Sequence, residues 1–162
     1  MRSGQFRSLL LLLVEHDVEV IVVGMLAGVL QGAPLTTADV DVVHRRTPEN
    51  VARLLAVLRA IGAVYRHDTR RIAPGESHLL GPAHQLLESS LGDIDCLGEI
   101  DGGKTYEDLI DKTVHLNLGG ERAIAVLDLA TLVEVKKRAG RPKDLAAIPV
   151  LEATLDEVRR TK

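Results

Sequence analysis

The chain has 162 residues, of which 46% are hydrophobic, and its formal net charge is −3. This length and apolar content predict a single domain over residues 1–162 with its own core. The acidic balance excludes a protein that coats nucleic acid or a membrane surface through its overall charge. Only 2% of the residues are aromatic, so we do not expect bases to stack on aromatic platforms.

The cysteine and histidine content argues against disulfide and zinc chemistry. Cys96 is the single cysteine, which is typical of a reducing compartment, and the six histidines form no HExxH motif. The apolar run from Leu9 to Val14 is too short for a membrane span, which needs about 20 apolar residues. It leads into charged residues and not into a signal-peptide cleavage site. We therefore expect a cytoplasmic protein with no membrane segment.

The first part of the chain alternates between helical and extended patterns. Helix formers dominate the start, and a β-branched run ending at Gly24 is typical of a buried strand. Thr47 followed by Pro48 is a helix N-cap with proline at the first helical position. The expected elements are a helix over Gln5–Glu15, a strand over Val18–Val23, two helical turns over Met25–Gln31, a strand over Asp39–Val43 and a helix from Thr47 to about Ile61.

The second part begins with a segment, residues 62–82, whose pattern is broken and predicts only short strands or loops. Arg66, Arg70 and Arg71 lie close together in it. The later elements are an antiparallel pair over Gln85–Glu88 and Ile94–Leu97, a hairpin of Val114–Leu118 and Arg122–Val126 around Gly119 and Gly120, a helix from Asp128 through Arg138 that ends at Gly140, and a last helical region from Pro142 that is interrupted or kinked at Pro149. The expected fold is α/β, with a mixed, twisted sheet of about five strands flanked by helices and a helical C-terminal segment.

Two aspartates in one predicted strand are the first candidate site residues. Side chains alternate faces along a strand, so Asp39 and Asp41 point to the same side. Like charges held together are unfavourable unless something compensates them. A solvated strand end would account for the pair, and so would a divalent cation, which selects oxygen ligands.

A third carboxylate lies in the apolar run Ile94–Leu97. Asp95 would cost several kcal/mol if it were buried there without a partner. If its strand lies beside the first, Asp95 completes a cluster of three carboxylates. Asp93 has the same strand parity and stays an alternative, although it follows Gly92 at the strand mouth, where a solvated charge is expected.

Three carboxylates suit phosphoryl transfer with two metal ions about 4 Å apart. Asp39 and Asp41 would hold both ions, and Asp95 would hold the ion that lowers the pKa of the acceptor hydroxyl. Catalysis would then depend on positioning and charge neutralisation. The expected cofactor is Mg²⁺ or Mn²⁺.

Several segments together resemble the nucleotidyltransferase superfamily, and small bacterial members most of all. The resemblance rests on the segments Val23-Gly24-Met25-Leu26-Ala27, Gly32-Ala33-Pro34, Thr37-Ala38-Asp39-Val40-Asp41, Leu91-Gly92-Asp93-Ile94-Asp95-Cys96-Leu97 and Lys136 to Asp144. It extends from about Val18 to Leu151. The chain is similar to minimal nucleotidyltransferases and to abortive-infection toxins.

This resemblance implies transfer of a nucleoside monophosphate from a nucleoside triphosphate to a protein or RNA hydroxyl, with tRNA as one possible acceptor. It also implies a cognate partner protein in a toxin–antitoxin pair. Catalytic and metal-binding roles fall to Asp39, Asp41 and Asp95. The nucleotide-binding residues it implies are Gly24, Met25, Thr37, Lys136 and Lys143.

The nucleotide-binding candidates each have a structural alternative. Gly24 would let the backbone approach the triphosphate at the start of a short helix, whose amides favour anions. Thr37 would either touch phosphate or end the loop before Asp39. Lys136 and Lys143, in the densest basic cluster, would either contact phosphate or RNA or simply favour a helix C-terminus.

Met25 departs from the family pattern, which usually has serine or glycine after Gly24. Methionine has no hydroxyl and crowds the phosphate path, and Leu35 replaces an arginine that many relatives have. An alternative function is therefore a weakened or inactive nucleotidyltransferase fold that acts as an antitoxin or regulatory binding module. A domain that metal only stabilises is a further alternative.

Three other residues have expected roles. Cys96 is expected in the core, since free cysteines are commonly buried. Asp144 is expected to cap the last helix. His84, near the strand of the third aspartate, is a candidate for mutation.

Overall fold

The structure is a computed structural model that describes residues 3–161. The helices are α1 (Ser3–Glu15), α2 (Gly24–Leu30), α3 (Pro48–Ala60), α4 (Glu76–Leu80), α5 (Tyr106–Leu109), α6 (Leu129–Ala139) and α7 (Pro142–Arg160), with a 3₁₀ turn at Ile110–Lys112. The strands are β1 (Val20–Val23), β2 (Asp39–His44), β3 (Val64–Tyr65), β4 (His84–Ser89), β5 (Gly92–Leu97), β6 (Thr113–Gly119) and β7 (Arg122–Leu127).

All of these strands join one sheet in the order β3-β4-β5-β2-β1-β7-β6. Two neighbouring pairs are parallel, β2 with β5 and β1 with β7, and the other pairs are antiparallel. The predicted α/β fold with a mixed sheet is confirmed, and so are the β4–β5 and β6–β7 pairs. The number of strands was underestimated, since the sheet has seven, one of them the two-residue strand β3.

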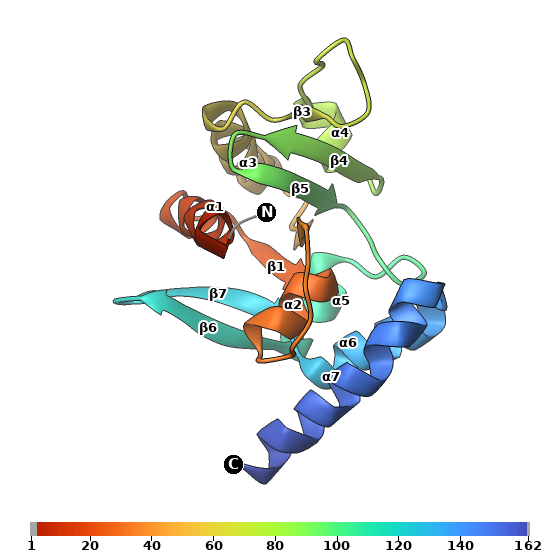
Figure 1. The fold of residues 1–162 in the computed structure, drawn as a ribbon. Coiled ribbons are helices and arrows are strands. Elements are labelled where there is room, and N and C mark those ends of the chain that lie inside the picture. The colour runs from red at the N-terminus through yellow and green to blue at the C-terminus, as the bar shows by residue number, and fades with distance from the viewer. Residues whose placement is uncertain (1–2, 162) are drawn as a thin grey trace.

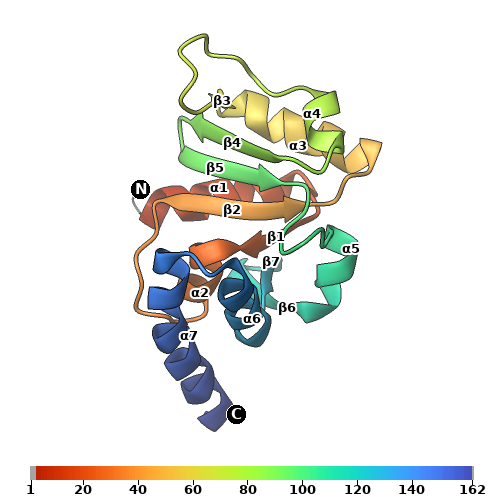
Figure 2. The same ribbon diagram turned by 90° about the vertical axis from the view of Figure 1, so that its right-hand side faces the viewer.

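Helices cover the two faces of the sheet unequally. Figures 1 and 2 show α1 and α3 on one face and α6 and α7 on the other, where α7 extends away from the sheet to the C-terminal end. On this second face α6 packs against α2, which contacts β1 and β2, and the helices leave β4 and β5 largely uncovered (Figure 2). The sheet surface next to β2 and β5 therefore lies beside the α6–α7 pair.

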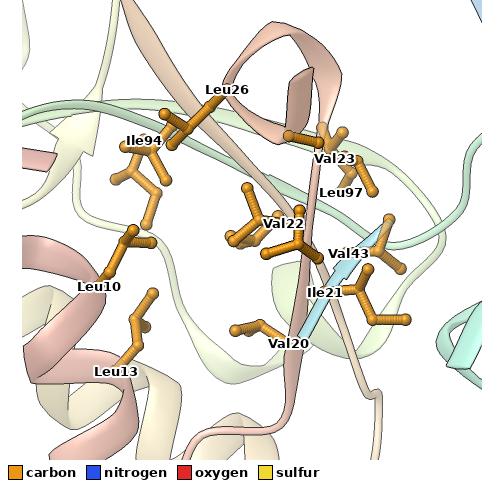
Figure 3. Packing of buried hydrophobic residues seen from close by; sticks show 14 of the residues in the cluster. Leu10, Leu13, Val20, Ile21, Val22, Val23, Leu26, Val43, Ile94 and Leu97 are labelled. Carbon is orange, nitrogen blue, oxygen red and sulfur yellow. The ribbon is translucent and has the colours of Figure 1, made fainter. Parts of the chain in front are cut away.

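Aliphatic side chains form the core, as the low aromatic content predicts. Figure 3 shows the strand β1 in its centre, with Leu10 and Leu13 of α1 and Ile94 of β5 around it. All four residues of β1 are buried, which explains why this strand reads as a continuous β-branched run instead of an alternating one. This buried strand ends directly at Gly24, where α2 begins.

The predicted N-caps Thr47 and Asp128 and the predicted end of α6 at Gly140 are confirmed. The side chain of Thr47 accepts a hydrogen bond from the amide of Asn50, and Asp128 accepts one from the amide of Thr131. Gly140 ends α6 with a φ of 65°. Of the two predicted outcomes at Pro149, an interruption or a kink, the interruption is wrong, because α7 continues through this residue. The short helices α4 and α5 were not predicted.

The helices also bear on membrane insertion. Between residues 3 and 161, no helix combines the length and the apolar character that crossing a membrane requires.

Candidate active site

The candidate site is built on the two parallel neighbours β2 and β5. Their register pairs Asp41 with Asp95 and Asp39 with Asp93. Partners in register point to the same face of a sheet, so all four carboxylates lie on one face. Val40, which lies between the two aspartates of β2, and its partner on β5 face the core on the other side. This explains the alternation of aspartate with apolar residues in both strands.

Three of these carboxylates converge. Asp39, Asp41 and Asp95 each have one oxygen that lies within 4.8 Å of the others. The predicted juxtaposition of the three side chains is therefore observed. Asp93, the alternative third residue, lies closer to the strand mouth with 36% of its side chain exposed, and it is not part of this group.

Asp41 is the most perturbed carboxyl group of the cluster. Its burial, together with the negative charges of Asp95 and Asp39, raises its pKa from 3.8 to about 7. One of its oxygens, Oδ1, is buried and makes no hydrogen bond within the described chain. An unpaired buried carboxylate oxygen is costly, so this atom is suited to a cation that no protein group supplies.

Gly24 gives the Asp41 side chain the space it occupies. Its φ is +66°, a conformation that favours glycine, and a Cβ atom at this position would lie 2.5 Å from Oδ2 of Asp41. In this structure Gly24 thus accommodates the side chain of Asp41. Together, the clustered oxygens, the raised pKa and the unpaired Oδ1 fit a divalent cation with a preference for hard oxygen ligands.

Arg66, which the sequence did not single out as a site residue, contacts the same cluster. Its Nη2 donates a hydrogen bond of 2.8 Å to Oδ1 of Asp95, and its Nη1 lies 3.6 Å from Asp93. Burial raises the pKa of Asp95, and the hydrogen bond and charge of Arg66 act in the opposite direction. The signal in the sequence was weak, because Arg66 is one of three arginines in a segment without a recognisable pattern.

Lys136 and Asp144 form a buried ion pair near the carboxylates. Lys136 Nζ lies 3.0 Å from Oδ1 of Asp144, and the two side chains are 7% and 0% exposed. Arg141 Nε donates to the other oxygen at 2.7 Å. Burial acts to raise the pKa of Asp144, but the hydrogen bonds from Arg141 and Lys136 outweigh it and hold the pKa at about 2. Asp144 also accepts from the backbone amide of Arg141, as predicted for a helix cap.

The remaining predicted nucleotide-binding residues lie in different surroundings. Lys143 is exposed, and Met25 is partly buried against the core. Thr37 exchanges hydrogen bonds with the backbone of Asp39, with a 3.1 Å bond from its hydroxyl to the carbonyl. This contact corresponds to the loop-ending alternative for Thr37.

A cavity of about 420 Å³ lies between Asp41 and Asp95 on one hand and the Lys136–Asp144 pair on the other. Charged and apolar side chains both line it, and exposed His84 is one of the lining residues, with its Nε2 2.7 Å from the carbonyl of Glu99. The charged lining residues are Asp41, Asp95, Asp101, Lys136, Arg141 and Asp144, and the apolar ones include Leu86, Leu97, Ile100, Leu127, Leu132 and Val135. Such a mixed, concave site is typical of small-molecule binding.

Cys96 has no place in this cavity. Its side chain is fully buried, and burial raises the pKa of its thiol. This environment is that of a core residue, as predicted, because a reactive cysteine needs an accessible thiolate.

Comparison with known proteins bears on the fold. No family model matches the chain, and no curated protein matches it by sequence. A crystal structure from Thermotoga maritima, of a protein provisionally named a nucleotidyltransferase, matches with a TM-score of 0.58 over 97% of this chain and 96% of that one, at 17% sequence identity. The chain therefore has a nucleotidyltransferase-like fold.

Proposed function

We propose that this protein is a metal-dependent nucleotidyltransferase, which transfers a nucleoside monophosphate from a nucleoside triphosphate to a hydroxyl group of a protein or an RNA. Asp39, Asp41 and Asp95 are the catalytic and metal-binding residues in this proposal. The observation that carries it is the convergence of these three carboxylates from two parallel strands, two of which, Asp41 and Asp95, line a cavity large enough for part of a nucleotide.

The donor set supports divalent-metal chemistry. Asp39 and Asp41 would hold two ions between them, and Asp95 would share the ion nearer the acceptor. When bound, the ions supply neutralisation of phosphate charge and a lower pKa for the acceptor hydroxyl. The unpaired Oδ1 of Asp41 is the atom in the cluster that most needs such a cation.

The other groups of the cavity would bind and orient the nucleotide. Lys136 carries a positive charge close enough to Asp41 to lower the pKa of that carboxyl group, so it is suited to contact a phosphate oxygen. Asp144 holds Lys136 in place through the buried ion pair. The apolar residues that line the cavity would exclude water from the reacting phosphate, which strengthens the electrostatic interactions within the site.

The test is incubation of the purified protein with each of the four labelled nucleoside triphosphates, Mg²⁺ or Mn²⁺, and lysate of the native host. We expect one triphosphate to label a protein or RNA band, and the kind of band identifies the acceptor class. The proposal is wrong if none of the four triphosphates transfers label with either metal while the protein remains folded.

The setting we propose is a toxin–antitoxin pair, with a cognate protein or a tRNA acceptor as partner. The support for it is the resemblance of the sequence to abortive-infection toxins. Co-purification from the native host tests it, because a cognate partner is expected in stoichiometric amount.

A second candidate function is a regulatory binding module that keeps the fold with weakened chemistry. Met25 favours it: this side chain directly follows Gly24 at the start of α2 and packs partly into the core. It offers no hydroxyl to a phosphate. A stoichiometric partner together with no nucleotide turnover would support this second function over the first.

A further inference from the structure

Arg66 occupies a fixed position at the edge of the carboxylate cluster. It directly follows the short strand β3, and its backbone amide donates to the carbonyl of Leu86 on β4. Its side chain is only 13% exposed. An arginine that is held in this way loses little further conformational freedom when it makes a contact.

The two ends of the guanidinium group have different partners. Nη1 donates a 2.8 Å hydrogen bond to the carbonyl of Leu87, and Nη2 donates one of 2.8 Å to Oδ1 of Asp95. The contact with the Leu87 carbonyl anchors the group to the backbone of β4, independently of Asp95. Arg66 thus restrains the Asp95 side chain through one of its two oxygens.

We propose that Arg66 is a positioning residue of the metal site: it orients the Asp95 carboxylate toward the oxygens of Asp39 and Asp41. The inference rests on the metal site of the proposed function and adds a residue to it. Arg66 contacts the ligand and does not belong to the ligand set. The loss of such an outer partner typically lowers metal affinity by about 10-fold to 100-fold.

The charge of Arg66 has the opposite effect, because a guanidinium group near the cluster repels a cation. The two effects are separated by two substitutions. Arg66→Lys keeps the charge, but a single ammonium group cannot contact the Leu87 carbonyl and Asp95 with the same fork. Arg66→Met removes the fork and the charge together.

The experiment is titration of the full chain with Mn²⁺ alone. Binding is measured by calorimetry or from the electron paramagnetic resonance signal of the free ion. We expect Arg66→Lys to remain folded and to bind Mn²⁺ about 10-fold more weakly than the wild type. If Arg66 acted only through its charge, Arg66→Lys would bind as the wild type does and Arg66→Met would bind more tightly. That pair of results would overturn the proposal.

Two controls make the result specific. Arg70→Lys changes an exposed arginine of the same segment, which pairs with Asp68, and it should leave Mn²⁺ affinity unchanged. In an Asp95→Asn background, Arg66→Lys should weaken binding no further, and a second loss of similar size would contradict a role through Asp95. If the wild type binds no Mn²⁺, the metal site of the proposed function fails as well. If the wild type binds Mn²⁺ and both Arg66 variants bind it equally well, only the role of Arg66 is refuted.

Discussion

Asp41 and Asp95 are direct partners across two parallel strands, although 53 residues lie between them in the chain. Their side chains therefore share one face of the sheet, and Asp39 joins them from the same strand as Asp41. Negative charges that are brought together and partly buried destabilise the fold unless a cation compensates them. This arrangement is the physical basis for the predictions that follow.

Asp41→Ala is expected to abolish nucleotide transfer and to leave the fold intact. The substitution removes the carboxylate proposed to hold both ions, and metal charge stabilisation is worth several kcal/mol, so the rate should fall by roughly a thousandfold or more. It also relieves repulsion with Asp39 and Asp95, so the melting temperature in the absence of metal should not decrease. The measurements are label transfer and thermal unfolding. Asp111→Ala, at an exposed position, is the matched control, and transfer retained by Asp41→Ala would remove this residue from the site.

The raised pKa of Asp41 predicts how stability depends on pH without metal. Folding raises this pKa from 3.8 to about 7, so the folded state binds the proton more tightly than the unfolded state does. The contribution of Asp41 to stability is therefore greatest at low pH and declines as the pH rises through this window. Asp41→Asn should be more stable than the wild type at about pH 8 by a larger margin than at about pH 5.

Thermal unfolding in EDTA at the two pH values measures that difference. Mn²⁺ should reduce the wild-type decline, because a bound cation replaces the proton as the partner of the carboxylate. A margin between wild type and Asp41→Asn that does not change with pH would show that the charges around Asp41 are already compensated.

Gly24→Ala is expected to damage both the fold and the site. A side chain at φ +66° is strained by roughly 1 kcal/mol, and the new Cβ would lie 2.5 Å from Oδ2 of Asp41. Gly62→Ala is the matched control, since Gly62 has a φ of +65° but no atom within 4 Å of the added Cβ. Both variants should lose stability in urea unfolding, whereas only Gly24→Ala should lose Mn²⁺ binding. Equal Mn²⁺ affinities of the two variants would contradict the close contact with Asp41.

Lys136 and Lys143 are expected to behave differently, although both lie in the basic segment near the C-terminus. Lys136→Met leaves the buried carboxylate of Asp144 with Arg141 alone, and breaking a buried ion pair costs about 3 kcal/mol. It should also weaken nucleotide binding, because this lysine lines the cavity. Lys143→Met, on the exposed surface, should change stability by less than about 0.5 kcal/mol. Urea unfolding and nucleotide titration of both variants check this, and similar effects at the two positions would argue against the ion pair.

The acidic strands could be predicted from the sequence because each contains a clear local pattern. The alternation of aspartate with apolar residues around Asp39 and Asp41 defines the face of β2, and the same applies to Asp95 in β5. The parallel pairing of these strands could be stated only as a condition, because α3, β3, α4 and β4 lie between them in the chain. Packing of those elements determines which strand lies beside β2.

Other features depend on tertiary contacts that leave no local pattern. The strand β3 has two residues, which are too few to show a period of two. Its membership of the sheet and the position of Arg66 were therefore missed. The separation of Lys136 from Lys143 depends on how α6 and α7 pack around Gly140. Pro149 was expected to interrupt or kink α7, and the helix continues through it, since tertiary packing can outweigh the preference of one residue.

The most direct test of the carboxylate site is the anomalous scattering of Mn²⁺ in crystals soaked with this ion and a non-hydrolysable nucleoside triphosphate. The structure predicts anomalous peaks bounded by Asp39, Asp41 and Asp95, with the triphosphate in the adjoining cavity beside Lys136. Crystals of the folded protein that bind the triphosphate elsewhere, or that show no manganese between the three carboxylates at saturating concentration, would contradict the proposed nucleotidyltransferase site.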